Sequence, residues 1–337
     1  MNYFITGGTG FIGTHLSSLL HEVHPETRIY NLDIVEPGTP LPTVKNYKPA
    51  LGKGEEHAAT FIYCDVRQPI ELEKVNITPD DVIFNFAAVH RTPGHPDPAY
   101  FETNIRGAEN VCAFAERHGI RKIVFTSSIA PYGAAEELKE ETTLPMPNTP
   151  YGISKLVAEK IHQTWQAGGE GRQLTIVRPG VVFGRGENGN FTRLYWGIRG
   201  HKFMYPGRKD TIKACIYVKE LVRFMLYRLE HHDSGVELYN CCYEPAYTIE
   251  HIVESMKRVT NMKVKVPFMP GWLIMTAAGI AGALGSPMGI CPARVRKLQI
   301  STNICGKKLS ASGYRFRSTF EEALADWYKD NGNLYLR

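Results

Sequence analysis

The sequence lacks the features that mark several common classes of protein. It contains no Cys-x-x-Cys pair and an odd number of cysteines, seven in 337 residues, so we expect neither a disulfide framework nor a metal site. It has no run of four basic residues, and its formal net charge is only +5, which argues against a nucleic-acid partner. These absences predict a protein of a reducing compartment, the cytoplasm.

Long hydrophobic runs are also missing. Residues 266–293 carry no charged side chain, but their apolar core from Gly271 to Gly285 is shorter than the roughly 20 residues that a spanning helix needs. No basic and apolar signal segment precedes the first expected strand. We therefore expect no spanning segment, and we expect Gly271–Gly285 to form a buried helix. Association with a membrane surface is the alternative.

The sequence does contain an alternation of short apolar segments with helix-like segments. Apolar residues that are continuous rather than alternating are typical of strands buried on both faces of a parallel sheet. The expected strands are Tyr3–Thr6, Arg28–Asp33, Thr60–Cys64, Asp81–Ala87, Lys122–Ser127 and Gln173–Arg178, and the expected helices are Phe11–His24, Asn104–His118 and Tyr151–Gln166. This order predicts an α/β fold with a Rossmann-type doubly wound parallel sheet.

Three glycines follow the first expected strand and open the first helix. Gly7, Gly10 and Gly13 have G-x-x-G-x-x-G spacing. A turn without side chains lets the backbone approach a pyrophosphate, and the free amide groups at the helix N-terminus, where Phe11 and Ile12 lie, face the phosphates. The spacing alone is weak in a chain with 31 glycines, but its place between strand and helix predicts a dinucleotide site.

Residues that end the next strands would complete the cofactor site. Asp33 can accept hydrogen bonds from the adenosine ribose and repels a 2′-phosphate, so it predicts NAD rather than NADP. Asp65, beside Val66, can reach the adenine amino group, although a helix cap is the alternative for Asp65. The fourth strand ends with Phe86, Ala87 and Ala88. The small residues among them would let the backbone lie against the cofactor.

The alternation of strands and helices loosens after Arg178. We expect residues 1–180 to form the NAD-binding domain, with a helix near 218–231 and a strand near 236–241 rejoining its sheet. Residues 181–337 would form a smaller, mostly helical substrate-binding part that is interleaved with it. From Tyr243 onward we expect helices without regular strand partners.

A tyrosine and a lysine lie four residues apart on one expected helix. Tyr151 and Lys155 therefore share a face, and a nearby ammonium lowers the pKa of a phenol from about 10 toward neutrality. Such a tyrosine can take a proton from an alcohol while hydride leaves the same carbon. Ser128 follows the fifth strand at the edge where open sheets bind ligands, and its hydroxyl could hold the substrate oxygen. Taken alone, Ser128 would more often be a turn residue.

Together these residues resemble the extended short-chain dehydrogenase/reductase superfamily, in its nucleotide-sugar epimerase/dehydratase branch. The resemblance implies that Ser128, Tyr151 and Lys155 are the catalytic triad and that the last two also contact NAD. It places Asn104 on the helix that braces the triad, and it places both Asn104 and Pro179 beside the cofactor. The substrate residues that it implies are Ser128, Asn190, Arg193 and Lys213.

The sequence departs from the family pattern in three places. Ile129 and Ala130 stand where dehydratases carry an acidic pair, so no dehydratase chemistry is expected. Lys213 stands where family members usually grip the nucleotide diphosphate with an arginine, and a lysine keeps the charge but loses the bidentate fork. Val181 replaces the asparagine that is common on the strand leading to the substrate loop.

The resemblance implies an NAD-dependent nucleotide-sugar 4-epimerase that acts through a transient 4-keto intermediate on a nucleotide-diphosphate sugar. Three alternatives stay open at this point. They are an NAD(P)H-dependent 4-keto-sugar reductase, a steroid- or lipid-type 3-hydroxy dehydrogenase, and a non-catalytic NAD-binding protein. We further expect a homodimer.

Overall fold

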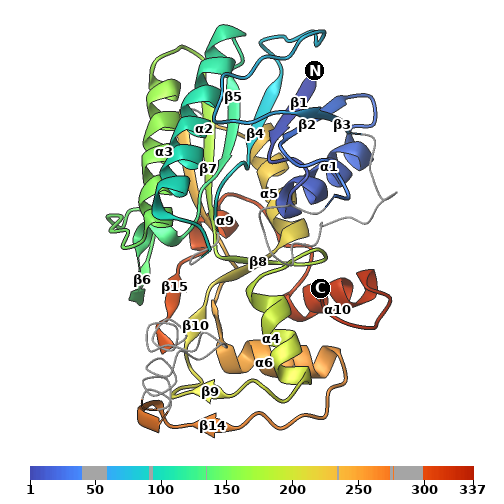
Figure 1. The fold of residues 1–337 in the computed structure, drawn as a ribbon, viewed down its shortest axis with the longest axis vertical. Coiled ribbons are helices and arrows are strands. Elements are labelled where there is room, and N and C mark those ends of the chain that lie inside the picture. Colours follow the sequence, from blue (N-terminus) through green and yellow to red (C-terminus); the bar gives the residue numbers. More distant parts are fainter. Residues whose placement is uncertain (40–58, 91–93, 134, 234, 274–275, 277–298) are drawn as a thin grey trace.

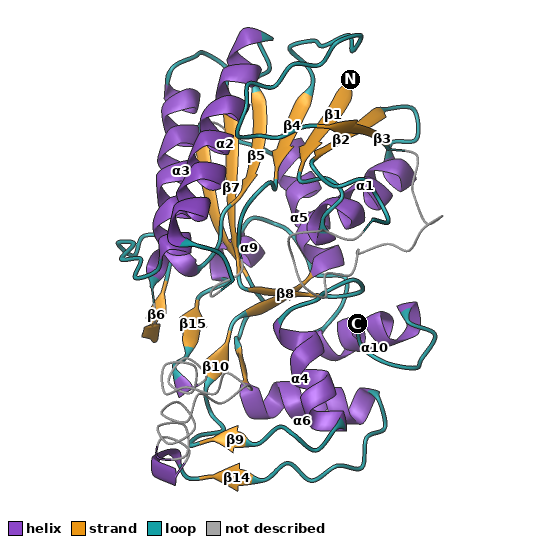
Figure 2. Ribbon diagram, in the orientation of Figure 1, coloured by secondary structure: helices purple, strands orange, loops and turns teal. Residues whose placement is uncertain are grey.

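The computed structural model describes residues 1–39, 59–90, 94–133, 135–233, 235–273, 276 and 299–337. In the view of Figures 1 and 2, the upper half is a sheet with helices on both sides, and the lower half combines short strands with helices. The chain passes between the two halves several times, so neither half is one continuous segment.

The upper half is built on a seven-stranded parallel sheet. Its order is β12-β7-β5-β4-β1-β2-β3, which confirms the predicted doubly wound fold. The strands are β1 (Asn2–Thr6), β2 (Arg28–Asp33), β3 (Thr60–Tyr63), β4 (Val82–Asn85), β5 (Lys122–Thr126), β7 (Gln173–Pro179) and β12 (Val236–Cys241). The order runs outward in both directions from β1, so a crevice forms at the carboxyl edge between β1 and β4.

Two pairs of helices cover the sheet. Helices α1 (Phe11–Val23) and α5 (Val218–Glu230) lie on one face, and α2 (Asp97–Arg117) and α3 (Pro150–Ala167) lie on the other. Helix α2 begins two turns before the expected start at Asn104, because a proline is tolerated in the first turn of a helix, where its missing N–H has no partner. The Thr149 hydroxyl caps α3 by accepting the Gly152 amide at 3.1 Å.

The lower half has more strands than the sequence predicted. Its strands are β6 (Ala135–Lys139), β8 (Val181–Phe183), β9 (Tyr205–Pro206), β10 (Ile212–Lys213), β11 (Cys215–Tyr217), β13 (Tyr247–Thr248), β14 (Phe268–Met269) and β15 (Thr302–Ile304). The expectation of helices without strand partners after Tyr243 is wrong, because β13 and β15 both pair with β10. Strands of two or three residues are too short to show a period of two in the sequence.

An aromatic core holds the lower half together. Phe183, Phe191, Phe320 and Trp327 are at most 3% exposed and pack as one cluster. The helices of this half are α4 (Asn190–Arg199), α6 (Ile249–Val259) and α10 (Phe320–Asp330). The four side chains come from β8, α4 and α10. Two further short helices of the described residues are η1 (Ala130–Tyr132) and α9 (Lys307–Ala311).

Two predictions concern membranes and metals. The buried helix expected at Gly271–Gly285 falls largely outside the described residues. Within the ranges that the structure describes, no helix is long and apolar enough to cross a membrane. The same ranges contain no cluster of three or more side chains suited to hold a metal ion.

A buried ion pair ties α3 to the strand β7. Arg178 donates to both oxygens of Glu159, with nitrogen–oxygen distances of 2.8 and 2.6 Å, and the two side chains are at most 3% exposed. The Ser127 hydroxyl donates to the same carboxylate. Because Lys155 lies one turn before Glu159, this pair fixes the part of α3 that carries the predicted triad lysine.

We expect Arg178→Met to lower the free energy of unfolding by about 3–5 kcal/mol, because it leaves the Glu159 carboxylate buried without its cation. Urea unfolding followed by circular dichroism measures this loss. The double variant Glu159→Gln/Arg178→Met, which removes both charges, should be more stable than the single variant. A single variant as stable as the wild type would contradict this account of the pair.

Candidate active site

The glycine turn brings two pieces of backbone into contact. Gly7 has a φ of +69°, and a Cβ atom there would lie 2.8 Å from the nitrogen of Ala87, two residues after β4. A Cβ on Gly13 would lie 2.6 Å from the Cα of Gly8. Side chains are thus excluded at both positions, and the turn packs closely between β4 and α1.

Helix α1 begins at this turn with its amide groups left for a ligand. Its N-cap is Gly10, which offers no side-chain hydrogen bond, and its first turn, beginning with Phe11 and Ile12, contains no acidic residue. An uncapped helix N-terminus carries partial positive charge and free N–H groups, which together favour a phosphate. This geometry fits the pyrophosphate of a dinucleotide.

The Asp33 carboxylate lies against the glycine turn. It accepts hydrogen bonds from the Thr9 amide at 3.2 Å and from the Ile34 amide at 2.8 Å. Burial raises the pKa of Asp33, and the hydrogen bonds from Thr9 oppose that rise. The carboxylate is therefore held at the end of β2, beside the turn that would carry the pyrophosphate.

Asp65 has a partner that the sequence analysis missed. The Arg67 guanidinium donates to both of its oxygens, at 2.9 and 2.6 Å, and these bonds are the largest cause that lowers the pKa of Asp65. The adjacent Val66 is buried and packs against Gly107 of α2. The sequence signal for this ion pair is an acid and a base two residues apart. Contact between Asp65 and adenine stays a prediction.

The structure brings the three predicted triad residues to the carboxyl edge of the sheet. Tyr151 lies in the first turn of α3, and Ser128, just after β5, lies close enough to its hydroxyl to influence its pKa. Lys155 lies one turn further along α3 and is 2% exposed. Its Nζ atom lies 4.3 Å from the ring centroid of Phe125. The arrangement places a phenol, a second hydroxyl and a cation together.

Burial dominates the proton equilibria of this site. It raises the pKa of Tyr151 to about 12, against the opposing hydrogen bond of Ser128. It lowers the pKa of Lys155 to about 7, against the opposing charge of Glu159. Burial thus opposes ionisation of the phenol in the protein alone, and a lowering of the phenol pKa by Lys155 stays a prediction.

A chain of hydrogen bonds braces the start of α3. Asn104 donates to the Ser154 hydroxyl at 2.8 Å, and Ser154 donates to the Tyr151 carbonyl at 2.9 Å. The Asn104 carbonyl oxygen accepts the Val89 amide at 2.9 Å. The bracing role implied for Asn104 is thus visible in its contacts, while Ser154 was not foreseen.

A second buried chain lies beneath the lysine, and the sequence analysis missed it. The Thr6 hydroxyl donates to Asn85, whose amide lies 3.1 Å from His162 Nε2. Burial lowers the pKa of His162 to about 4, so the ring is neutral at pH 7. His162 also stacks on Phe125, with ring centroids 4.1 Å apart. Asn85 and His162 thus have hydrogen-bond partners and add no second positive charge next to Lys155.

The predicted substrate residues come from other elements. Asn190 and Arg193 are exposed in the first turn of α4, and Arg193 donates to the Asn190 side chain at 2.9 Å. Lys213, on β10, donates to the Ile300 carbonyl at 2.7 Å. Pro179 ends β7, and its carbonyl accepts the amide of Ile129, the residue after Ser128. Among these residues, Asn190 is thus bonded to Arg193, and Pro179 is bonded to the residue that follows Ser128.

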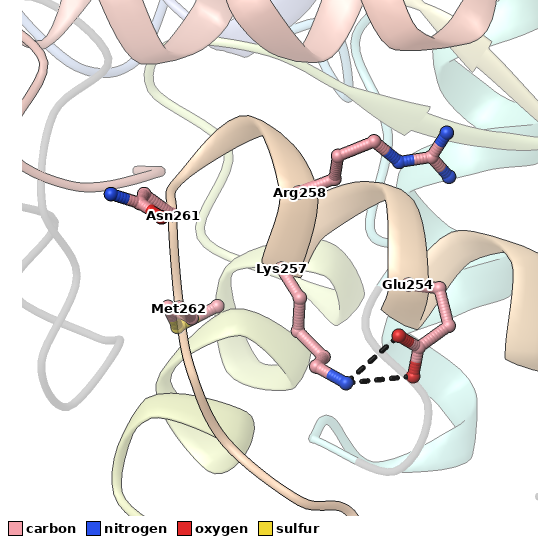
Figure 3. A pocket seen from close by; sticks show the side chains of 5 residues that line it. All are labelled: Glu254, Lys257, Arg258, Asn261 and Met262. Atoms are coloured by element: carbon pink, nitrogen blue, oxygen red, sulfur yellow. Dashed lines mark hydrogen bonds and ion pairs between the residues drawn. The ribbon is translucent and has the colours of Figure 1, made fainter.

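A surface pocket at the end of α6 contains none of the predicted residues. Figure 3 shows its lining, and the lysine there, Lys257, bonds to both oxygens of Glu254 at 2.9 and 2.8 Å. Arg258, Asn261 and Met262 complete the lining. It offers no paired acid and base near an apolar cavity, so we assign no activity to it.

Comparison with known proteins shows similarity to a family of enzymes and to individual members of it. The sequence matches the NAD dependent epimerase/dehydratase family over residues 3–242. It is 31% identical over 331 residues to the N-acetyl-alpha-D-glucosaminyl-diphospho-ditrans,octacis-undecaprenol 4-epimerase of Escherichia coli O157:H7, which covers 96% of this chain and 93% of that protein. It is 26% identical to UDP-glucose 4-epimerase 3 of Oryza sativa subsp. japonica, over 79% of this chain and 78% of that protein.

Solved structures share the fold. The UDP-glucuronic acid 4-epimerase from Bacillus cereus, in complex with NAD, superposes with a TM-score of 0.73 at 19% identity and covers 99% of this chain and 100% of that chain. The family match spans the glycine turn, the triad and the predicted substrate residues. This chain therefore belongs to the NAD-dependent epimerase/dehydratase family of extended short-chain dehydrogenase/reductase enzymes.

Proposed function

We propose that this enzyme is an NAD-dependent 4-epimerase of a hexose that is carried on a diphosphate. The observation that carries the proposal is that Ser128 lies close to the Tyr151 hydroxyl, one helical turn from the buried Lys155. These groups lie at the edge of the sheet that also presents the glycine turn and Asp33. An acid/base pair beside a dinucleotide site supports oxidation and reduction of one carbinol carbon.

The residues present fit NAD. The amide groups at the start of α1 would hold the pyrophosphate, Asp33 the adenosine ribose, and Lys155 the nicotinamide ribose. When bound, NAD supplies the acceptor and donor of hydride. Close packing of Gly7 on Ala87 leaves backbone, rather than side chains, to face the cofactor.

The protein groups would then move one proton. Tyr151, as phenolate, takes the proton of the sugar C4 hydroxyl, and Ser128 holds the oxygen as it becomes a carbonyl. The Lys155 ammonium favours the phenolate by its charge. If the 4-keto sugar turns over in the site, the hydride that the cofactor supplies would return to the opposite face of C4. Tyr151 would return the proton to the oxygen, and the product would be the C4 epimer.

The carrier of the sugar is the finer question. A nucleotide is the carrier implied by the sequence and by the name of the rice relative. A polyprenol is the carrier in the name of the Escherichia coli relative, which matches over nearly the whole chain. Lys213 bonds to the Ile300 carbonyl and lacks the arginine fork of the family pattern, but both carriers present a diphosphate, so the length of the match with the Escherichia coli relative is what favours the polyprenol.

A substrate screen tests the proposed function. The purified protein with NAD is incubated with UDP-N-acetylglucosamine and, separately, with N-acetylglucosaminyl-diphospho-polyprenol, and NMR follows the sugar C4 configuration. Conversion of either compound to its C4 epimer supports the proposal, and the preferred compound identifies the carrier. Net oxidation of NADH with a 4-keto sugar, or reduction of NAD by a steroid alcohol, without any epimer, would replace it by one of the alternatives.

We also infer a cytoplasmic homodimer. Ile153 and Val157 support the dimer, since they are 40% and 36% exposed one turn apart on α3. Six described cysteines are free thiols, which suits a reducing compartment.

Tyr151→Phe keeps the aromatic ring and removes the proton acceptor. We expect turnover to fall by roughly 10²–10⁴-fold while NAD binding survives. Tyr328→Phe, on α10, is the matched control and should keep full turnover. Equal rates for Tyr151→Phe and the wild type would rule out the phenol as the acid/base.

Asp33→Ala removes the carboxylate that would meet the 2′-phosphate of NADP. We expect the wild type to bind NAD more tightly than NADP, and the variant to lose that preference. Titration calorimetry with both cofactors measures the two ratios. A wild type that prefers NADP would show that Asp33 does not contact the ribose.

NAD affinity should fall as pH rises above about 7. The pKa of Lys155 is lowered to about 7 in the protein, and binding of an anionic cofactor to the ammonium raises it. Affinity is then full below this value and declines above it, until the pKa of the complex is reached. Calorimetry across this pH range tests the slope, and Lys155→Arg, which stays charged, should flatten it. An unchanged slope in that variant would assign the titration to another group.

A further inference from the structure

Large apolar side chains are exposed at one end of the lower half. Phe268, Trp272 and Leu273 are 51%, 71% and 41% exposed. Phe268 lies on β14, which pairs with β9 at the end of the molecule that is lowest in Figure 1. Trp272 and Leu273 follow within five residues, and the Leu273 amide bonds back to the Pro270 carbonyl. Adjacent exposed aromatic residues of this size mark a surface that meets another phase or partner.

The charges that lie next to these side chains along the sequence are of one sign. The sequence contains no aspartate or glutamate between Glu254 and Glu321. Lys263 and Lys265 precede β14 directly and are exposed. We call Lys263, Lys265, Phe268, Trp272 and Leu273 the β14 surface.

Two acids close to the segment after β9 already have basic partners. Asp210, in that segment, accepts from Arg208 at 2.8 Å, and Glu250, on α6, accepts from Lys209 at 3.0 Å. The exposed lysines of the β14 surface therefore add to its potential without a compensating carboxylate from these residues. The surface combines apolar side chains with net positive charge.

We propose that the β14 surface docks this enzyme onto a bilayer that contains anionic phospholipid. A tryptophan ring is stable at the depth of the lipid headgroups, where its apolar body and polar N–H both find partners. Phe268 and Leu273 enter the adjoining acyl boundary, and Lys263 and Lys265 reach the phosphates. The proposed contact is a peripheral one, and none of the described helices is long and apolar enough to cross a bilayer.

Charge favours a bilayer over a second copy of the chain. Two β14 surfaces brought face to face would place lysines near lysines, and like charges at an interface oppose association. An anionic bilayer offers the opposite sign over a wide area. This docking does not depend on the reaction proposed above, because it concerns residues outside the candidate active site.

Vesicle sedimentation tests the proposal with the full chain. The protein is mixed with vesicles of phosphatidylcholine alone, or of phosphatidylcholine with phosphatidylglycerol, and the bound fraction is measured. We expect binding to the anionic vesicles only, weakening as salt is raised because the lysine–phosphate attraction is screened. Binding measured in this way is read without any enzyme activity, so its failure is distinct from failure of the proposed function.

Variants separate the two parts of the surface. Trp272→Ser should weaken the partition onto anionic vesicles about tenfold, because it removes a large apolar contact. Replacing Lys263 and Lys265 by glutamine should weaken it about fivefold for each lysine. Trp196→Ser, which alters a tryptophan 44% exposed on α4, is the matched control and should bind like the wild type. Circular dichroism and NAD titration confirm that each variant is folded.

Three results would overturn the proposal. The first is a wild type that sediments with neither kind of vesicle. The second is a Trp272→Ser variant that binds anionic vesicles as well as the wild type does. The third is a wild-type oligomer that Trp272→Ser dissociates, which would make the β14 surface an interface between copies.

Discussion

The site depends on keeping a positive charge on a lysine that is almost completely buried. Lys155 is 2% exposed, and burial lowers its pKa to about 7. Its charged and neutral forms therefore have similar free energies near pH 7. Glu159, one turn away, opposes the loss of the proton, but its oxygens are already held by Arg178 and Ser127. The lysine thus has a nearby negative charge without a closed ion pair. Its ammonium stays available to a cofactor ribose and to the phenol.

Contacts with the rest of the fold fix the position of Lys155 and of the groups around it. Helix α3 carries Tyr151, Lys155 and Glu159 along one side, and the ion pair with Arg178 fixes it to β7. Asn104 fixes the first turn of the same helix from α2. A neutral His162 fills the space beyond Lys155 and brings no second cation. The cofactor half of the site is built differently, from backbone packing at Gly7 and an uncapped helix start.

Much of this arrangement follows from local sequence. Buried parallel strands are continuous apolar segments, so β2 and β12 were predicted with their observed bounds, and the glycine turn and triad spacing identified the site. Strands of two residues, such as β10 and β13, leave no local signal, and their pairing is set by the packing around them. Partners distant in sequence were missed for the same reason. Asn85 and His162 meet only once β4 and α3 are packed together, and the phenol pKa depends on a burial that the sequence does not show.

The central claim is that hydride leaves C4 of the sugar and returns to the same carbon. It is tested most directly with a diphosphate-linked sugar that carries deuterium at C4, incubated with the NAD-loaded enzyme in ordinary water. The account predicts that the C4 epimer keeps its deuterium at C4 and that no free reduced cofactor accumulates. An epimer with solvent hydrogen at C4 would contradict the account, because Tyr151 and Ser128 act on the oxygen and leave the carbon to the cofactor.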